Sequence, residues 1–502
     1  MNEMTSVRPA VPLSKITQPL DVLIVGAGIS GLAAARYLKV ERPDDSFAIV
    51  DEKLTFGGTW VTHTYPGIRS DSDLHTFGFS FKPWVGPPIA TAAEILAYLD
   101  ETIDEYGLAD HIHYGWRGQT ASWDSERKLW TLKVQNVETG EMEEISARFL
   151  WMCQGYYRHS EGYTPQWPGM ETFKGEVIHP QTWPEDFDGK GKHLVVIGSG
   201  ATAATLVPNV VDQVEHVTML QRSPTYFRSE KNEIPIAKRL RELQVEEDWV
   251  HEIVRREMLL GSHDFTNRCF NEPETVRDEL IGIARRYLGE EFDVEKHFTP
   301  SYLPWRQRIA RIPDGDLYKA LATGRASVVT DEIETFVEDG IKLKSGEFLK
   351  ADVVATATGF NLCQMGDIRF DIDGEALDFH DTLGYRSMMF TGVPNLAWVM
   401  GYWRSSWTLR AELVAQFVVR LLDHMQEHQK STVVPRLRES EKDMQIVDWP
   451  DEEDFNPGYL LRGKNVLPKR GTTNEWRLNQ DYWTEKDDFA AIDFGDEVFA
   501  YD

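Results

Sequence analysis

Two glycine-rich segments of this 502-residue chain have the spacing that binds the phosphates of a dinucleotide. The first, Gly26-Ala-Gly28-Ile-Ser30-Gly31, follows the apolar run 21–25 and precedes the helix-favouring residues 32–38. In such a unit the first glycine permits a tight turn, the second lets a pyrophosphate approach the backbone, and the third lets helix and strand pack closely. The apolar run 47–50 is followed directly by Asp51, whose carboxylate is suited to a ribose diol. We therefore predict that one dinucleotide is bound by Gly26, Gly28, Ser30, Gly31 and Asp51.

The second segment is Gly198-Ser199-Gly200-Ala201-Thr202-Ala203. It lies between the apolar run 194–197 and another helix-favouring stretch. The following strand-like run, 217–220, ends in Gln221-Arg222 and carries no carboxylate. A guanidinium at this position suits a 2′-phosphate through bidentate, charge-assisted hydrogen bonds, which favours NADPH over NADH. The alternative is that Arg222 is a solvated surface residue. We assign FAD to the first unit and NADPH to the second, with the NADPH contacts at Gly198, Ser199, Gly200, Ala201, Thr202, Ala203, Gln221 and Arg222.

These two units predict an α/β fold with two Rossmann-like, doubly wound dinucleotide-binding domains. Strand-like runs at 112–114, 120–123, 130–134 and 149–155 predict a small antiparallel excursion that returns to the first sheet. Apolar residues at helical spacing over 235–286 predict a helical insertion at about 230–300. We expect the first part of the FAD domain at 1–155, the NADPH domain at 156–355, and the return to the FAD domain with a C-terminal segment at 356–502.

One long amphipathic helix is predicted at 409–424, in the C-terminal part of the chain. Trp398, Trp403 and Trp407 lie just ahead of it, and we assign these three side chains to core packing.

Composition excludes several other classes of protein. The formal net charge of −28 disfavours binding to nucleic acid or to anionic lipid. No stretch approaches the roughly 20 apolar residues of a membrane span, and no secretory signal is visible at the N-terminus. The odd set Cys153, Cys269 and Cys363 contains no close redox pair, which argues against a disulfide reductase and for a reducing compartment. We expect a cytoplasmic protein without a metal site and leave its oligomeric state open.

Two longer motifs are more specific than the glycine loops. They are Gly58-x-Trp60-x-x-x-x-Tyr65-Pro66-Gly67-x-x-x-Asp71 and Phe173-x-Gly175-x-x-x-His179-x-x-x-Trp183-Pro184. With Gly155-Tyr-Tyr, Pro304-Trp305 and Trp407-Thr-Leu in the same order, they resemble the type I Baeyer-Villiger monooxygenases of the class B flavoprotein monooxygenases. The likeness is greatest to the ethionamide-activating subgroup, which oxidises ketones and also thioamide or sulfide sulfur. One departure is Arg306, where that subgroup generally has an acid.

The resemblance implies an FAD- and NADPH-dependent enzyme that inserts one oxygen atom of O2 into a ketone through a C4a-peroxyflavin, giving an ester or lactone, and that also oxidises sulfides. It implies that Arg308 is the catalytic cation and that Asp71 holds its guanidinium and the nicotinamide amide. The alternatives for Arg308 are an exposed surface arginine, or Arg306 or Arg311 as the cation. The remaining cofactor contacts implied by the family are Gly58, Thr59, Trp60, Arg69, Asp71 and Gln181.

The resemblance places His179 at the domain linker rather than beside the reacting atoms. It therefore implies that His179 couples domain motion to catalysis, and a purely structural histidine is an equal alternative.

Two other functions stay open at this point. A flavin-containing monooxygenase that acts on amines and sulfides through the neutral hydroperoxide would need no fixed cation, and the Trp183-Pro184 ending argues against it. A non-catalytic FAD/NADPH redox sensor needs only the two nucleotide folds, and the presence of Arg308 and Asp71 argues against that. The sequence does not predict which ketone or sulfide is the substrate.

Overall fold

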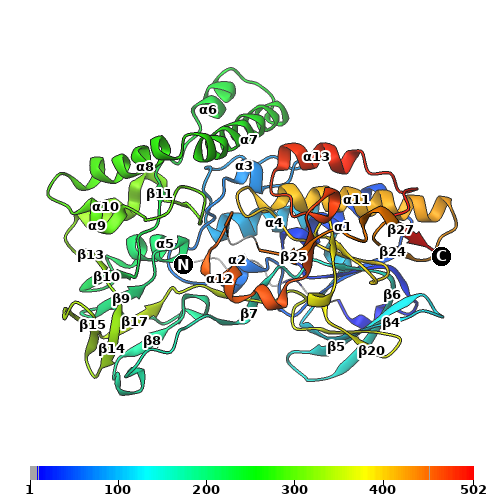
Figure 1. Cartoon of the computed structure of the whole chain (residues 1–502), viewed down its shortest axis with the longest axis horizontal. Coiled ribbons are helices and arrows are strands. Elements are labelled where there is room, and N and C mark those ends of the chain that lie inside the picture. The colour runs from blue at the N-terminus through cyan, green and yellow to red at the C-terminus, as the bar shows by residue number, and fades with distance from the viewer. Residues whose placement is uncertain (1–7, 9–10, 451–452) are drawn as a thin grey trace.

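The structure, a computed structural model, describes residue 8, residues 11–450 and residues 453–502. Two α/β domains lie side by side, each built on a sheet with parallel strands at its centre (Figure 1). This confirms the predicted fold class of two Rossmann-like domains with an antiparallel excursion and a helical insertion.

The first domain contains a nine-stranded sheet in the order β20-β19-β4-β5-β6-β1-β2-β3, with β23 also paired to β6. β6 pairs in parallel with β1 and antiparallel with β5, so the predicted excursion extends the same sheet. The strands are β1 (Leu20–Val25), β2 (Phe47–Asp51), β3 (Ile112–Tyr114), β4 (Trp116–Asp124), β5 (Leu129–Asn136), β6 (Met142–Met152), β19 (Arg369–Ile372), β20 (Glu375–Leu377) and β23 (Leu396–Trp398).

Helices α1 (Ile29–Glu41), α4 (Ala92–Glu105) and α11 (Trp407–Glu427) pack against one face of this sheet and share its hydrophobic core. The predicted helix at 409–424 is therefore confirmed, and it begins at Trp407. The opposite face packs against residues of the C-terminal segment, such as Trp449, Phe455 and Leu460.

The second domain has a five-stranded parallel sheet in the order β13-β10-β9-β17-β8. Its core packs against α5 and α10, and a separate three-stranded antiparallel sheet follows β13 in the chain. The elements are β8 (Glu176–Ile178), β9 (His193–Ile197), α5 (Ala201–Val210), β10 (His216–Gln221), α10 (Asp316–Ala322), β13 (Ala326–Thr330), β14 (Ile333–Val337), β15 (Gly340–Leu343), β16 (Phe348–Lys350) and β17 (Val353–Thr356).

The predicted helical insertion comprises α6 (Pro235–Glu242), α7 (Glu247–Asn271), α8 (Pro273–Leu288) and α9 (Val294–Phe298). Figure 1 shows α6, α7 and α8 along one side of the molecule, and α7 packs on α3 (Leu74–Phe77) of the first domain. The buried Arg255 of α7 donates hydrogen bonds to the carbonyl oxygens of His75, at 2.8 Å, and Gly78, at 3.0 Å. Leu243, one of the apolar residues within 235–286, is 57% exposed and lies just after the end of α6.

The two domains are joined by β7 (Tyr157–Gly162) and β18 (Phe360–Leu362), which pair antiparallel and form the hinge strands. None of the helices described is both long and apolar enough to cross a membrane. The remaining elements are α2 (Thr59–Thr62), β11 (Phe227–Arg228), β12 (Ala310–Arg311), β21 (Gly384–Tyr385), β22 (Met389–Phe390), β24 (Val433–Pro435), β25 (Ile446–Asp448), α12 (Gly458–Arg462), β26 (Lys469–Gly471), α13 (Tyr482–Ala490) and β27 (Phe499–Tyr501).

Candidate functional site

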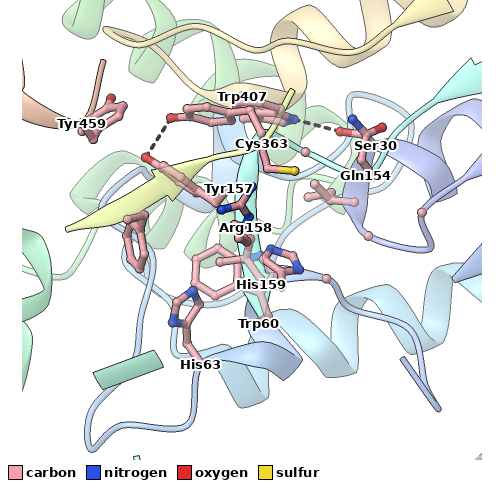
Figure 2. A pocket seen from close by; sticks show the side chains of 18 of the residues that line it. Ser30, Trp60, His63, Gln154, Tyr157, Arg158, His159, Cys363, Trp407 and Tyr459 are labelled. Atoms are coloured by element: carbon pink, nitrogen blue, oxygen red, sulfur yellow. Dashed lines mark hydrogen bonds between the residues drawn. The ribbon is translucent and has the colours of Figure 1, made fainter. Parts of the chain in front are cut away.

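A cavity of about 850 Å³ is lined by both nucleotide-binding units, the hinge strands and α12 (Figure 2). It gathers most of the residues predicted from the sequence, although they come from segments far apart in the chain. Those on its wall are Gly26, Gly28, Ser30, Asp51, Gly58, Thr59, Trp60, Arg69, Asp71, Gly200, Ala201, Thr202 and Arg308. Those that do not line it are Gly31, His179, Gln181, Gly198, Ser199, Ala203, Gln221 and Arg222.

The three glycines of the first loop have different roles. A Cβ atom at Gly31 would lie 1.8 Å from the carbonyl oxygen of Gly26, so Gly31 is required for close packing. Gly26 has φ +107°, a conformation that favours glycine. Gly28 precedes the first residue of α1, and a Cβ there would meet nothing closer than the Cα of Gly58, at 3.6 Å. The cavity wall at Gly28 is thus left open beside a helix N-terminus, as the approach of a pyrophosphate requires.

Asp51 ends β2 and is buried at the cavity wall. Its two carboxylate oxygens accept backbone N–H groups from Ala27, at 2.6 Å, and Lys53, at 2.8 Å. Burial nevertheless raises the pKa of Asp51 from 3.8 to about 6. A ribose diol would add two donors to this carboxylate and favour its ionised form. The first unit therefore fits the nucleotide that the sequence assigns to it.

Trp407 was expected in the core, and it packs against both hydrophobic clusters of the first domain, but it is only partly buried. Trp398 and Trp403 are buried, but Trp407 lines the cavity as the first residue of α11. Its indole N–H donates to the Ser30 hydroxyl at 2.8 Å (Figure 2). Its ring stacks on Tyr156 with centroids 5.3 Å apart. Helical packing places the ring at the N-terminus of α1, a position that no local sequence pattern indicates.

The second glycine loop repeats the division of roles seen in the first. Gly198 has φ +133°, and a Cβ there would lie 2.3 Å from the carbonyl oxygen of Ala357. Gly200 precedes α5, and a Cβ there would have no neighbour within 4 Å. Ser199 donates from its hydroxyl to the carbonyl of Ser223 at 3.2 Å, and Ala203 is buried in the core. The open wall at Gly200 fits the diphosphate of a second nucleotide.

The two residues predicted at the end of β10 differ in their surroundings. Gln221 is buried, and its amide nitrogen donates to the carbonyl of His297, at 2.7 Å, and to the hydroxyl of Thr330, at 2.8 Å. Its side chain therefore bonds within its own domain. Arg222 is exposed at the strand end, and its role toward a 2′-phosphate stays a prediction.

Arg308 and Asp71 form a bidentate ion pair across the cavity wall. The guanidinium Nε lies 3.0 Å from Oδ2, and Nη2 lies 3.2 Å from Oδ1. The charge of Asp71 raises the pKa of Arg308 above its ordinary value, so this arginine stays a cation. Arg306 instead faces the C-terminal segment, where it donates to the carbonyl of Glu453 at 3.3 Å and lies 3.6 Å from Asp454. Its charge is thus directed away from the cavity.

A cluster of aromatic residues beside Arg308 was missed by the sequence reasoning. The Tyr156 hydroxyl donates to that of Tyr157 at 2.8 Å, and the Tyr157 ring lies 4.6 Å from Phe360 and 5.8 Å from Tyr459. Figure 2 shows the Tyr157 hydroxyl pointing toward the side of the pocket where Tyr459 lies. Burial raises the pKa of Tyr156 and of Tyr157 well above the usual value, so both stay protonated. The Gly155-Tyr-Tyr motif was the available signal, whereas Tyr459 belongs to no motif.

His179 and Gln181 together connect the second domain to the segments of the two hinge strands. Its Nδ1 accepts the backbone N–H of Gln181 at 3.1 Å, so the ring proton is on Nε2 and is donated to the carbonyl of Gly359, also at 3.1 Å. The Gln181 side chain donates to the carbonyls of Arg158, at 3.1 Å, and His159, at 2.7 Å. Burial lowers the pKa of His179, which keeps the ring neutral.

Two further histidines, His63 and His159, line the cavity and carry no sequence signal of function. Burial lowers the pKa of His63 to about 3 and that of His159 to about 4, so both are neutral at pH 7.

Residues 8, 11–450 and 453–502 contain no group of three or more His, Cys, Asp and Glu side chains placed to hold a metal ion. Cys153, Cys269 and Cys363 are buried free thiols, and burial raises the pKa of Cys269 and Cys363 to about 12. Thiolates at these positions are therefore scarce at neutral pH.

Comparison with known proteins agrees with this architecture. Residues 20–257 match the family model described as pyridine nucleotide-disulphide oxidoreductase. The chain is 44% identical to the FAD-containing monooxygenase EthA of Mycobacterium tuberculosis over 469 residues, which cover 93% of this chain and 94% of EthA. It is 40% identical to the probable FAD-binding monooxygenase AlmA of Acinetobacter baylyi, with 96% of each chain covered.

Two solved structures share the fold over almost the whole chain. An oxidized steroid monooxygenase bound to NADP has a TM-score of 0.77 at 22% identity, with 96% of this chain and 99% of that chain covered. A cyclohexanone monooxygenase in an open form has a TM-score of 0.70 at 20% identity, with 97% and 100% covered.

The two nucleotide folds and the cavity between them define an oxidoreductase of the two-dinucleotide type. At the identity and coverage found, the chain belongs to the EthA-like FAD-containing monooxygenases. The resemblance seen in the sequence motifs is thereby confirmed at the level of the family.

Proposed function

We propose that this protein is an NADPH-dependent monooxygenase of the Baeyer-Villiger type that converts a ketone to an ester or lactone. The balanced reaction consumes ketone, O2, NADPH and one proton, and yields ester, NADP+ and water. The observation that carries the proposal is the Arg308–Asp71 ion pair on the wall of a cavity that both nucleotide folds share. Among proteins of this fold, the cyclohexanone monooxygenase is named for a ketone, which supports this class of substrate.

The division of cofactors follows from the two glycine loops. FAD binds the first domain, built from residues 1–155 and 356–502, and NADPH binds residues 156–355. Gly28 and Asp51 provide an open backbone and a ribose acceptor for FAD, and Gly200 provides the matching opening for NADPH. When bound, FAD supplies the exchange of electrons with NADPH and the activation of O2.

Arg308 supplies the fixed positive charge that ketone oxygenation needs. An oxidant that attacks a carbonyl carbon must be anionic, and the carbonyl oxygen gains negative charge during the attack. The guanidinium stabilises both charges because it remains protonated beside Asp71. Asp71 positions the guanidinium through its two hydrogen bonds. Sulfides are the second substrate class that we propose, since a sulfur lone pair attacks a neutral oxidant and has less need of the cation.

His179 acts at a distance from the reacting atoms. It links the loop after β8 to Gly359, which directly precedes hinge strand β18, while Gln181 holds hinge strand β7. We infer that this contact transmits domain movement to the cavity during the catalytic cycle.

Products from a mixed panel of linear ketones, cyclic ketones and sulfides test the proposal. Purified enzyme with NADPH in air should give esters or lactones, each one oxygen atom heavier than its ketone by mass spectrometry. Oxidation of sulfides and amines alone, with no ketone consumed, would support the flavin-containing N/S-monooxygenase instead. A redox sensor would give neither fast NADPH oxidation nor product.

A further inference from the structure

Five arginines line the cavity within the described part of the chain, and four of them are paired with a carboxylate. Arg308 pairs with Asp71, and the other three form the pairs Arg69–Asp316, Arg117–Glu52 and Arg158–Asp367. The fifth, Arg311 at the end of β12, has no carboxylate within 4.0 Å among residues 8, 11–450 and 453–502. In a chain of net charge −28, an arginine in a cavity without an acidic partner indicates that its partner is an anionic ligand.

The surroundings of Arg311 add to its positive charge. β12 pairs in parallel with β11, so Arg311 lies beside Arg228, and their mutual repulsion contributes, after burial, to lowering the pKa of Arg228. Glu230 pairs with Arg228 and leaves Arg311 uncompensated. The carboxylates on neighbouring elements are likewise engaged, since Asp71 holds Arg308 and Asp316 holds Arg69.

Arg311 also shares the cavity wall with the first turn of α5, the helix that follows the second glycine loop. β12 packs against α5, a helix of ten residues whose first turn shares the cavity wall through Ala201 and Thr202. The backbone at Gly200, just before α5, is open to the same cavity. A helix N-terminus and a guanidinium that face one cavity are complementary to a phosphate group.

We propose that Arg311 is a coenzyme-binding residue that pairs with the diphosphate of the nicotinamide coenzyme. This inference rests on the proposed function for the presence of NADPH in the second domain. It gives three arginines separate roles, with Arg308 at the reacting atoms, Arg222 at the 2′-phosphate and Arg311 at the diphosphate. NADPH and NADH share the diphosphate, so Arg311 contributes equally to the binding of both.

The test compares coenzyme binding in two variants of the FAD-loaded enzyme. Arg311→Ala should raise the Kd of NADP+ and of NAD+ by the same factor, about tenfold for one lost charge-assisted contact, and leave the preference between them unchanged. Arg222→Ala should weaken NADP+ alone. Titration calorimetry measures both affinities without turnover. Arg311→Lys, which keeps the charge, should recover part of the loss, and Arg256→Ala, which removes an exposed charge on α7, should have no effect.

Several outcomes would overturn the inference. These are wild-type affinity in Arg311→Ala, a loss confined to NADP+, or a loss of FAD, the last of which would place Arg311 at the other cofactor. If coenzyme binding were unchanged but turnover of acid-bearing ketones alone fell, Arg311 would recognise the substrate instead. A wild-type enzyme that binds NADP+ but makes no ester would refute the ketone proposal and leave Arg311 in its role. A wild-type enzyme that binds neither coenzyme would refute both.

Discussion

The backbone of Gly28 faces that of Gly58 across a space that a methyl group could enter, with its carbon 3.6 Å from the Cα of Gly58. The protein alone therefore tolerates alanine at position 28, whereas a bound pyrophosphate does not. Gly28→Ala should fold normally and be purified largely colourless, and circular dichroism with the flavin absorbance in the visible range would measure both properties. Gly31→Ala is the matched control, because its methyl overlaps the Gly26 carbonyl oxygen and should impair folding itself. A fully yellow Gly28→Ala enzyme would show that FAD is bound elsewhere.

Removal of the Arg308 charge should separate two classes of substrate. Arg308→Ala should bind FAD normally but oxygenate ketones about a hundredfold more slowly, as expected for the loss of a preorganised interaction of a few kcal/mol. Sulfide oxidation should fall less, and Arg308→Lys should restore part of the ketone activity because it lacks the planar fork that matches Asp71. Stopped-flow measurement on prereduced enzyme with NADP+ bound isolates oxygenation. If ketone turnover by Arg308→Ala equalled that of the wild type, Arg311 would be the next cation to test, since Arg306 faces away from the cavity.

Asp51 should make FAD affinity depend on pH. Its pKa in the apoprotein is raised to about 6 by burial, and ribose hydroxyl donors favour the ionised form. FAD affinity should therefore be full well above pH 6 and fall as the pH drops through about 6. The stability of the apoprotein depends on pH in the opposite direction. Because folding raises the pKa of Asp51, its contribution to the free energy of unfolding is present below about pH 4 and is lost as the pH rises through about 6. Fluorescence of released FAD, followed across this pH range, measures the affinity. Asp51→Asn should bind FAD more weakly, and an unchanged pH dependence in this variant would assign the titration to another group.

Arg222→Ala should reduce the preference for NADPH over NADH by raising the Michaelis constant for NADPH. The reason is the loss of the exposed guanidinium that suits a 2′-phosphate, a group absent from NADH. Steady-state kinetics with both coenzymes gives the ratio of their kcat/KM values. An unchanged ratio would mean that the 2′-phosphate is held by a different residue.

The sequence predicted those parts of the site that depend on local sterics. The glycine loops, with the strands and helices around them, follow from residue spacing, and the structure places Gly28 and Gly200 at the open wall of one cavity. Sequence alone could not show that Trp407 reaches Ser30, because that contact depends on the packing of α11 against α1. Gln221 illustrates the same limit, since its side chain bonds to His297 from a helix of the insertion that no motif relates to β10. The sequence likewise could not predict roles for Tyr459 and Arg311, because these depend on the residues that surround them in the cavity.

The hydrogen bonds of Arg255 have a consequence for protein engineering. This arginine belongs to the helical insertion, yet it holds the backbone of residues 75–78, a short distance along the chain from Asp71. The insertion thus supports the segment that follows Asp71, although 180 positions separate Arg255 from His75 in the sequence. A graft that replaces the insertion with that of a relative would also replace Arg255 and its hydrogen bonds to the first domain. A chimera needs an arginine at the position of Arg255, or it loses the tie that keeps the loop after Asp71 in place.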